Sequence, residues 1–185
     1  MRMFRILIPV ALSAVVTLPA LAADYVQAPG SSLAFAGKYQ GETFSGTFPD
    51  FRTTLRFDPA DLGAGKLAVT IPLATATTQN PDYDSEMRGS AFFDVSKFAN
   101  ATYTASGFRD LGDGRYAADG TLELRGVRKP VTLTFTWTPG TRPLLSGRAT
   151  VPRLAFGVGG GEWADTSMIP DEIAISTRLH LQPAN

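Results

Sequence analysis

The sequence has no cysteine and only one histidine among its 185 residues. Without cysteine there are no disulfides, no thiolate nucleophile, no thiolate metal site and no lipid-bearing cysteine of a bacterial lipoprotein. The histidine, His180, alternates with Leu179 and Leu181, which places it on the polar face of a strand. The usual nucleophile and base pairs and histidine-rich metal sites are therefore excluded, and the core alone must stabilise the fold.

An excess of charge of either sign is also missing. The chain has 17 basic and 17 acidic residues, and two of the arginines lie in the first five positions. Without those two, 15 basic residues remain against 17 acidic ones, which gives a formal charge near −2. This balance argues against nucleic acid as a partner, because phosphates require a basic surface.

Long apolar runs are absent except at the N-terminus. The run Ile6–Leu18 follows two arginines and leads into Ala20, Leu21 and Ala22, the small-x-small pattern that a signal peptidase cleaves. Its 13 residues are short of the roughly 20 that a membrane-spanning helix needs. We therefore expect residues 1–22 to be a cleaved secretory signal peptide, residues 23–185 to form one domain, and the mature protein to reside in the periplasm.

What the sequence does have is strict alternation of apolar and polar residues. From Gly120 to Trp137 the chain reads GTLELRGVRKPVTLTFTW, which is two amphipathic strands around a turn. Segments of the same kind recur at short intervals, bounded by glycine, proline or aspartate. The predicted strands cover residues 31–39, 44–48, 53–57, 66–73, 103–108, 115–124, 131–137, 145–151 and 173–181.

Only Pro81–Gly89 has the features of a helix. Asn80 is a good N-cap and Pro81 occupies the first helical position, where proline is favoured. Eight or nine strands and one short helix predict an all-β barrel or sandwich. Closure into a barrel is favoured because it removes the exposed edges that a disulfide-free secreted chain would otherwise have to protect.

Two other candidate sites in the sequence are weak. Asp82, Asp84 and Glu86 alternate like the start of a calcium-binding loop, but Met87 and Phe93 replace the required glycine and bidentate glutamate. The glycines within residues 157–161 lack the following helix of a phosphate-binding loop. We interpret these glycines as a bend or bulge at a barrel corner.

Four blocks in the sequence resemble the YceI-like family, which comprises periplasmic or secreted lipocalin-like proteins often described as polyisoprenoid-binding. The blocks are GKYQGETFSGTF at 37–48, FFDVSKF at 92–98, GTLELRGVRKPVTL at 120–133 and FGVGGGEW at 156–163. The resemblance implies an eight-stranded antiparallel lipocalin-like barrel with the helix packed beside it. It also implies an elongated channel for an isoprenoid, a quinone tail or a fatty acid amide. GEWADT at 161–166 resembles the subset found beside, or fused to, membrane b-type cytochromes.

The apolar face of the predicted strands supplies the candidate ligand-binding residues. Alternation cannot distinguish a channel lining from an ordinary packed core, and the resemblance favours the channel. The predicted set is Phe35, Phe48, Val69, Ile71, Tyr103, Leu122, Leu124, Leu133, Phe135, Phe156 and Ile175, with Tyr39 and Trp163 beside Glu162 and Asp165 at a polar mouth. For Trp163, a plug at the end of the barrel is an equally good interpretation.

We expect non-catalytic binding, sequestration or transport of a long-chain isoprenoid lipid or quinone, as a monomer or homodimer that contacts the membrane at most peripherally. No cofactor and no metal are expected beyond the bound polyisoprenoid, quinone or other long-chain lipid. The alternative is a packed barrel that serves as the partner of a membrane b-type cytochrome and its quinone redox system. A carboxylate enzyme is disfavoured, because acidic residues in the clear strands, such as Glu123, alternate outward.

Overall fold

The computed structural model describes residues 23–184, so the predicted signal peptide lies outside the described residues. Strands dominate this part of the chain, and none of its helices is long and apolar enough to cross a membrane. The strands are β1 (Ala23–Gln27), β2 (Ser32–Tyr39), β3 (Glu42–Thr47), β4 (Arg52–Phe57), β5 (Lys66–Pro72), β6 (Asn100–Ser106), β7 (Arg109–Gly112), β8 (Arg115–Leu124), β9 (Val127–Thr138), β10 (Leu144–Pro152) and β11 (Glu172–Pro183). The helices are α1 (Pro81–Arg88) and the short 3₁₀ turns η1 (Leu62–Ala64), η2 (Leu73–Thr75), η3 (Arg153–Phe156) and η4 (Gly161–Trp163).

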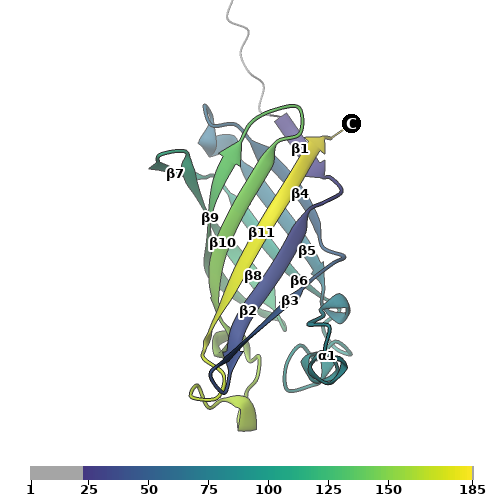
Figure 1. Ribbon diagram of the computed structural model, residues 1–185. Coiled ribbons are helices and arrows are strands. Elements are labelled where there is room, and N and C mark those ends of the chain that lie inside the picture. The colour runs from purple at the N-terminus through teal and green to yellow at the C-terminus, as the bar shows by residue number, and fades with distance from the viewer. Residues whose placement is uncertain (1–22, 185) are drawn as a thin grey trace, which may run out of the picture.

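Eight strands close into an antiparallel barrel in the order β1, β4, β5, β6, β8, β9, β10 and β11, and β11 pairs back to β1 (Figure 1). The barrel and its single short α-helix, predicted from the sequence, are confirmed. β7 pairs only with β8, and β2 and β3 extend the sheet from β11.

The local sequence explains the connection between β8 and β9. Leu124 pairs with Val127, and Arg125 and Gly126 between them have φ values of 52° and 73°. Two positive φ values in a two-residue loop match the twist of the flanking strands, and glycine adopts such values without steric cost. The turn thereby sets the register of the whole hairpin.

All nine predicted strands are present, with ends shifted by a few residues. Asn80 caps α1 as predicted, because its side-chain oxygen accepts hydrogen bonds from Asp82 N (3.0 Å) and Tyr83 N (3.4 Å). The strands β1 and β7 were not predicted. They have five and four residues, which is too short for alternation to stand out.

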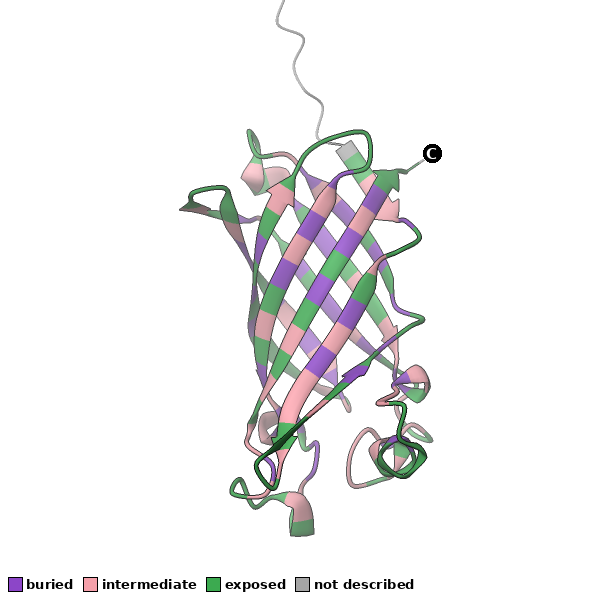
Figure 2. Cartoon of the chain, viewed as in Figure 1, coloured by how far each residue is buried: buried purple, intermediate pink, exposed green. Residues whose placement is uncertain are grey.

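One half of the barrel is packed solid. This half carries β7, β1 and the end of β11, and lies uppermost in Figure 1. At its centre the ring of Phe57, which is 2% exposed, lies 4.9–5.4 Å from the rings of Trp137, Tyr116, Phe108 and Phe135. Figure 2 shows buried and exposed residues alternating along the strands around this core. We call this half the aromatic end.

The opposite end is closed by loops. Residues 89–98, after α1, and residues 153–171, which include η3 and η4, lie at the lower end of the barrel in Figure 1. Gly159 N donates a hydrogen bond to Ala91 O (2.8 Å), which links the two segments. We call these two segments the end cap.

The barrel wall is incomplete beside α1. β2 pairs with residues 174–178 of β11, and β3 pairs with β2, so β3 ends the sheet on that side. Within residues 23–184, the other edge of β3 has one ladder contact, an isolated bridge between Thr47 and Thr77. Its hydrogen bonds are Thr47 N to Thr77 O (2.8 Å) and Thr77 N to Thr47 O (3.0 Å). We call this boundary between β3 and residues 77–98 the seam.

Candidate functional site

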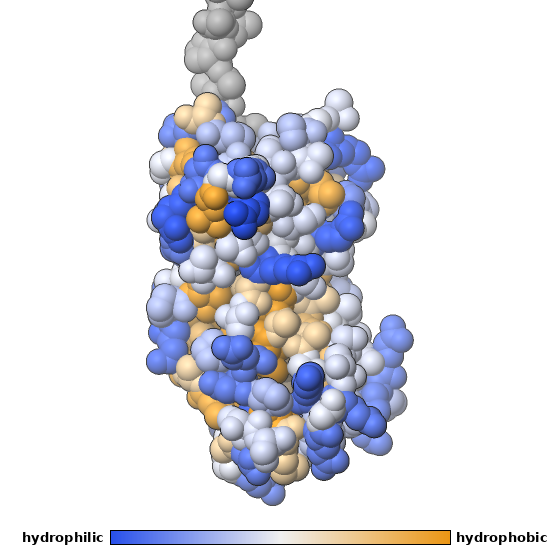
Figure 3. Space-filling model, turned by 60° about the vertical axis from the view of Figure 1, so that its left-hand side comes forward, coloured by the Kyte–Doolittle hydropathy of each residue, from blue (hydrophilic) through white to orange (hydrophobic). Residues whose placement is uncertain are grey.

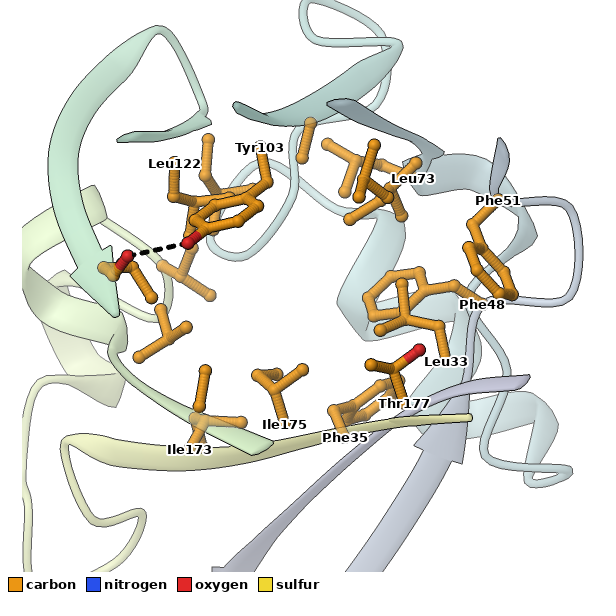
Figure 4. Close-up of a pocket in the computed structure, with 18 of the residues that line it drawn as sticks. Leu33, Phe35, Phe48, Phe51, Leu73, Tyr103, Leu122, Ile173, Ile175 and Thr177 are labelled. Carbon is orange, nitrogen blue, oxygen red and sulfur yellow. Dashed lines mark hydrogen bonds between the residues drawn. The ribbon is translucent and has the colours of Figure 1, made fainter. Parts of the chain in front are cut away.

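A cavity of about 220 Å³ occupies the lower half of the barrel, between the aromatic end and the end cap. Every strand of the lower wall contributes inward side chains, and Met87 of α1 and Phe92 and Phe93 of the end cap complete the lining. Figure 4 shows the labelled side chains arranged as a ring around an open centre. The cavity is therefore an internal space bounded by apolar groups on nearly all sides.

Nine of the thirteen predicted ligand-binding residues line this cavity. They are Phe35, Phe48, Val69, Ile71, Tyr103, Leu122, Leu124, Leu133 and Ile175. Eight of them come from six different strands, and Phe48 directly follows β3. The closed sheet brings the eight together because their alternation puts them all on its inner face.

The other four predicted residues lie elsewhere. Phe135 faces inward as predicted but at the height of the aromatic end, where it packs against Phe57. Phe156 is 1% exposed within the hydrophobic core, away from the cavity lining. The rings of Tyr39 and Trp163 are 6.3 Å apart and form an outer layer, in which Trp163 lies 5.5 Å from Phe92.

The acidic groups predicted at a polar mouth do not face the cavity. Glu162 and Asp165 are both exposed on the end cap. The carboxylate of Asp165 accepts hydrogen bonds from Ser167 Oγ (2.7 Å) and Ser167 N (2.8 Å), and these bonds lower the pKa of Asp165. Asp165 therefore stabilises a local turn.

Nineteen lining residues were missed by the sequence analysis. Those on strands continue the phase of predicted neighbours, as Leu67 does for Val69, so the same alternation contains them. Those on α1 and the end cap have no period that could reveal them. The missed residues are Leu33, Phe44, Phe51, Thr53, Leu67, Leu73, Met87, Phe92, Phe93, Ala101, Val131, Ala149, Val151, Arg153, Val158, Ile169, Ile173, Thr177 and Leu179.

Glycines in the wall keep the centre of the cavity open. The ring of Phe35 lies over Gly46 on β3, and the ring of Tyr103 lies over Gly120 on β8; a Cβ at either glycine would overlap the ring. Because these positions lack side chains, both rings lie flat against the wall.

Two polar groups in the lining are satisfied by the protein itself. Tyr103 Oη lies 2.8 Å from Ala118 O and 3.0 Å from Val131 O, and burial raises the pKa of Tyr103 to about 12. Thr177 Oγ1 donates a hydrogen bond to Ser32 O (2.9 Å). Tyr103 thus stays neutral at physiological pH, and both hydroxyls already have partners.

Of the residues that the structure describes, Arg153 is the one charged side chain in the lining, and it is 3% exposed. Its guanidinium donates all five of its N–H groups to backbone carbonyls of the end cap, and burial lowers the pKa of Arg153. The five acceptors are Pro170 O (3.1 Å), Val158 O (3.0 Å), Gly159 O (2.7 Å), Trp163 O (2.8 Å) and Ile169 O (2.7 Å). Arg153 therefore holds the end cap together and has no N–H left for a ligand.

The glycines that precede η4 bend a loop around this arginine. Gly157, Gly159 and Gly161 have φ values of 69°, 65° and 63°. A Cβ at Gly159 would also overlap a terminal nitrogen of Arg153. The predicted bend or bulge at a barrel corner is wrong, because the glycines shape the end cap rather than a strand.

On the far side of the seam, α1 is fixed to the chain that precedes it. Asp84, which is 8% exposed, accepts hydrogen bonds from Thr77 Oγ1 (2.6 Å), Thr78 N (2.7 Å) and Thr78 Oγ1 (2.8 Å). Burial alone would raise the pKa of Asp84, but these hydrogen bonds hold it below its usual value. Helix α1 and Thr77 thus form one unit facing β3.

Among residues 23–184, no carboxylate and no histidine line the cavity. In the part of the chain that the structure describes, no three His, Cys, Asp or Glu side chains are grouped to hold a metal ion. The calcium-like spacing of Asp82, Asp84 and Glu86 accordingly corresponds to the first turns of α1, where Asp84 is a structural hydrogen-bond acceptor.

The outer surface differs along the barrel axis. In the view of Figure 3, apolar surface gathers in the lower half, at the level of the cavity, with polar groups around it. In residues 23–184 the one large hydrophobic side chain classed as exposed is Tyr83 of α1, so the apolar patches in this view come from partly buried residues.

A family profile matches nearly the whole described chain, and individual relatives match a smaller part of it. The profile of the YceI-like domain matches residues 25–181. A UPF0312 protein of Vibrio cholerae is 30% identical over 137 residues, 71% of this chain and 72% of its own length. UPF0312 proteins of Shewanella baltica are 32% identical over 120 residues, and this match covers 63% of the length of those relatives.

Solved structures share the fold. BcnA from Burkholderia cenocepacia is 30% identical, with a TM-score of 0.77, over 80% of this chain and 94% of BcnA. A polyisoprenoid binding domain from Saccharophagus degradans, implicated in plant cell wall breakdown, is 16% identical, with a TM-score of 0.67, over 89% of this chain and all of that domain. The barrel, the cavity, and the match over residues 25–181 agree, and the chain belongs to the YceI-like family.

Proposed function

We propose that this protein is exported to the periplasm, where it binds and sequesters or carries a long-chain isoprenoid lipid or quinone without catalysis. The observation that carries the proposal is the internal apolar cavity of about 220 Å³. Its few polar groups, Thr53 apart, are hydrogen-bonded within the protein. A cavity of this kind favours a guest that is bound through apolar contact.

Membership of the YceI-like family supports a lipid ligand. The structural neighbour from Saccharophagus degradans is described as polyisoprenoid binding, and its barrel resembles this one. The alternative, a packed barrel that acts only as a partner of a membrane cytochrome, is disfavoured by the presence of the cavity.

In the conformation described, the cavity of about 220 Å³ is smaller than the roughly 300–1,000 Å³ of typical small-molecule pockets. Each methylene that it buries contributes about 0.8 kcal/mol. Because immobilising the ligand costs at least about 4 kcal/mol, tight binding of a long chain requires the cavity to widen.

The seam is the part of the wall that can widen most readily. Elsewhere the wall is held by continuous strand ladders, whereas in residues 23–184 only two backbone hydrogen bonds cross the seam, both between Thr47 and Thr77. Phe44 on one side of the seam and Met87, Phe92 and Phe93 on the other line the cavity. We infer that the lipid chain passes through, and expands, this boundary.

A disulfide across the seam is expected to weaken the binding of a long prenyl chain at least tenfold. Directly opposed residues with both hydrogen bonds have Cα atoms about 5.5 Å apart, a distance that a disulfide spans. The chain has no cysteine of its own, so Thr47→Cys/Thr77→Cys creates a single disulfide. Binding of a polyprenol is measured by native mass spectrometry before and after reduction with dithiothreitol, which should restore affinity.

The reduced form of the same variant controls for the lost hydrogen bond between Thr77 and Asp84. A second disulfide, Val26→Cys/Thr54→Cys, joins β1 to β4 outside the cavity and should leave binding unchanged. Equal affinity of the oxidised and reduced seam variants would rule out the seam as the route.

Identification of the natural cargo is the direct test of the proposed function. The mature protein is purified from its own periplasm without detergent and weighed by native mass spectrometry, and any released mass is identified after organic extraction. A stoichiometric prenyl lipid or quinone is the expected result. A protein without bound mass that also takes up no added polyprenol or quinone would contradict the proposal and favour a protein partner.

A further inference from the structure

One polar atom in the cavity wall has no partner in the protein. In residues 23–184, two buried side-chain oxygens lack any hydrogen bond, Thr53 Oγ1 and Gln27 Oε1, and only Thr53 lines the cavity. Thr53 is 4% exposed. A buried hydroxyl without a partner costs about 1–3 kcal/mol, so such a group points to a partner that the protein does not supply.

Thr53 lines the cavity from β4 beside the packed half of the barrel, and its hydroxyl oxygen is itself buried. Thr53, Leu55 and Phe57 are the inward residues of β4, and of these only Thr53 is in the lining. Phe57 already belongs to the aromatic end. Along β4, Thr53 is therefore the last side chain that a ligand meets before the packed half of the barrel.

The hydroxyl can turn toward a ligand at little cost. Rotation about the Cα–Cβ bond of threonine exchanges the hydroxyl and methyl groups between staggered positions. Since Thr53 Oγ1 makes no hydrogen bond in the structure described, none is lost on rotation. Thr177, the other threonine in the lining, is bonded to Ser32 O and lacks this freedom.

The rest of the lining determines the charge of the group that Thr53 can meet. An ionised phosphate or carboxylate inside the cavity would need donors to offset its desolvation. Arg153 has given all five N–H groups to backbone carbonyls, and Tyr103 and Thr177 are also engaged. The hydroxyl of Thr53 is the one that remains for a ligand, and a single neutral hydroxyl can bind one neutral donor or acceptor.

We propose that Thr53 is a specificity-determining residue which hydrogen-bonds a neutral polar group, a hydroxyl or carbonyl, at the inner end of the bound lipid. This inference rests on the proposed function and narrows its ligand class to prenyl alcohols and quinones. Pure hydrocarbons have no polar group and cannot form a hydrogen bond with Thr53. Prenyl phosphates must leave their head outside the cavity and gain nothing from Thr53.

The test compares three C20 probes, geranylgeraniol, its hydrocarbon analogue and geranylgeranyl phosphate, on the wild type, Thr53→Val and Thr53→Ser. Valine has nearly the shape of threonine without the hydroxyl, and serine retains the hydroxyl. Competition native mass spectrometry should show that Thr53→Val lowers the affinity for geranylgeraniol about tenfold, which equals about 1.4 kcal/mol of binding free energy. The hydrocarbon and the phosphate should bind the wild type and Thr53→Val alike, and Thr53→Ser should keep the preference for the alcohol.

A second readout needs no ligand. Because the hydroxyl of Thr53 is buried without a protein partner, Thr53→Val should raise the melting temperature of the empty protein. If Thr53→Val keeps the wild-type preference for the alcohol, the role of Thr53 is refuted while lipid binding stands. If no probe binds the wild type at all, it is the proposed function that fails.

Discussion

Replacing Phe135 with aspartate is expected to unfold the barrel. Phe135 is 3% exposed, and its ring lies 5.4–5.7 Å from the rings of Phe57, Phe108 and Tyr116. Loss of a buried phenyl ring alone costs about 3–5 kcal/mol, and a carboxylate among aromatic rings adds its desolvation. The sum approaches the whole stability of a typical domain, about 5–15 kcal/mol.

Urea unfolding, followed by circular dichroism, measures this effect. Thr134→Glu is the matched control, because Thr134 is the next residue on β9 and points outward, opposite Arg148. Its free energy of unfolding should stay within about 0.5 kcal/mol of the wild type. A folded Phe135→Asp variant with wild-type stability would mean that the aromatic end is not packed as described.

Unlike Phe135→Asp, the variant Ile71→Glu should stay folded but no longer bind lipid. Ile71 faces inward like Phe135, but it lines the cavity and is half-buried. Water that enters the lower half can hydrate the carboxylate in the empty protein. A bound lipid would remove that water, at a cost of several kcal/mol, so the affinity for a polyprenol should fall more than 100-fold.

The binding of Ile71→Glu is compared with that of Thr70→Glu, whose side chain lies on the outer face opposite Arg52. Circular dichroism establishes that both variants are folded, and native mass spectrometry measures their load of polyprenol. If Ile71→Glu retains wild-type affinity, the cavity is not where the lipid binds.

The contrast between these two positions shows what alternation can and cannot predict. It places Phe135 and Ile71 on the inner face correctly, because successive strand side chains point to opposite faces. It carries no information about height along the barrel axis, which depends on the register between strands. One residue therefore lies in solid packing and the other beside open space, although their sequence signals are alike.

The end cap was the least predictable part of the site. No role for Arg153 was predicted from the sequence, and arginine is almost never fully buried unless its charge is paired. Its partners are five carbonyls contributed by a loop that has no periodicity. The hydroxyl of Thr53 was also hidden, because only the three-dimensional hydrogen-bond pattern shows that it lacks a partner.

Because Arg153 recognises the end cap through main-chain atoms, most side chains of that loop take no part in holding it in place. Carbonyl groups are common to all residues, so the identities at exposed positions such as Glu162 and Thr166 can change without loosening the closure. The arginine, the glycines with positive φ and Asp165 with its local turn are the positions constrained by geometry. The exposed side chains of the end cap can therefore change by mutation while the structure of the barrel stays the same.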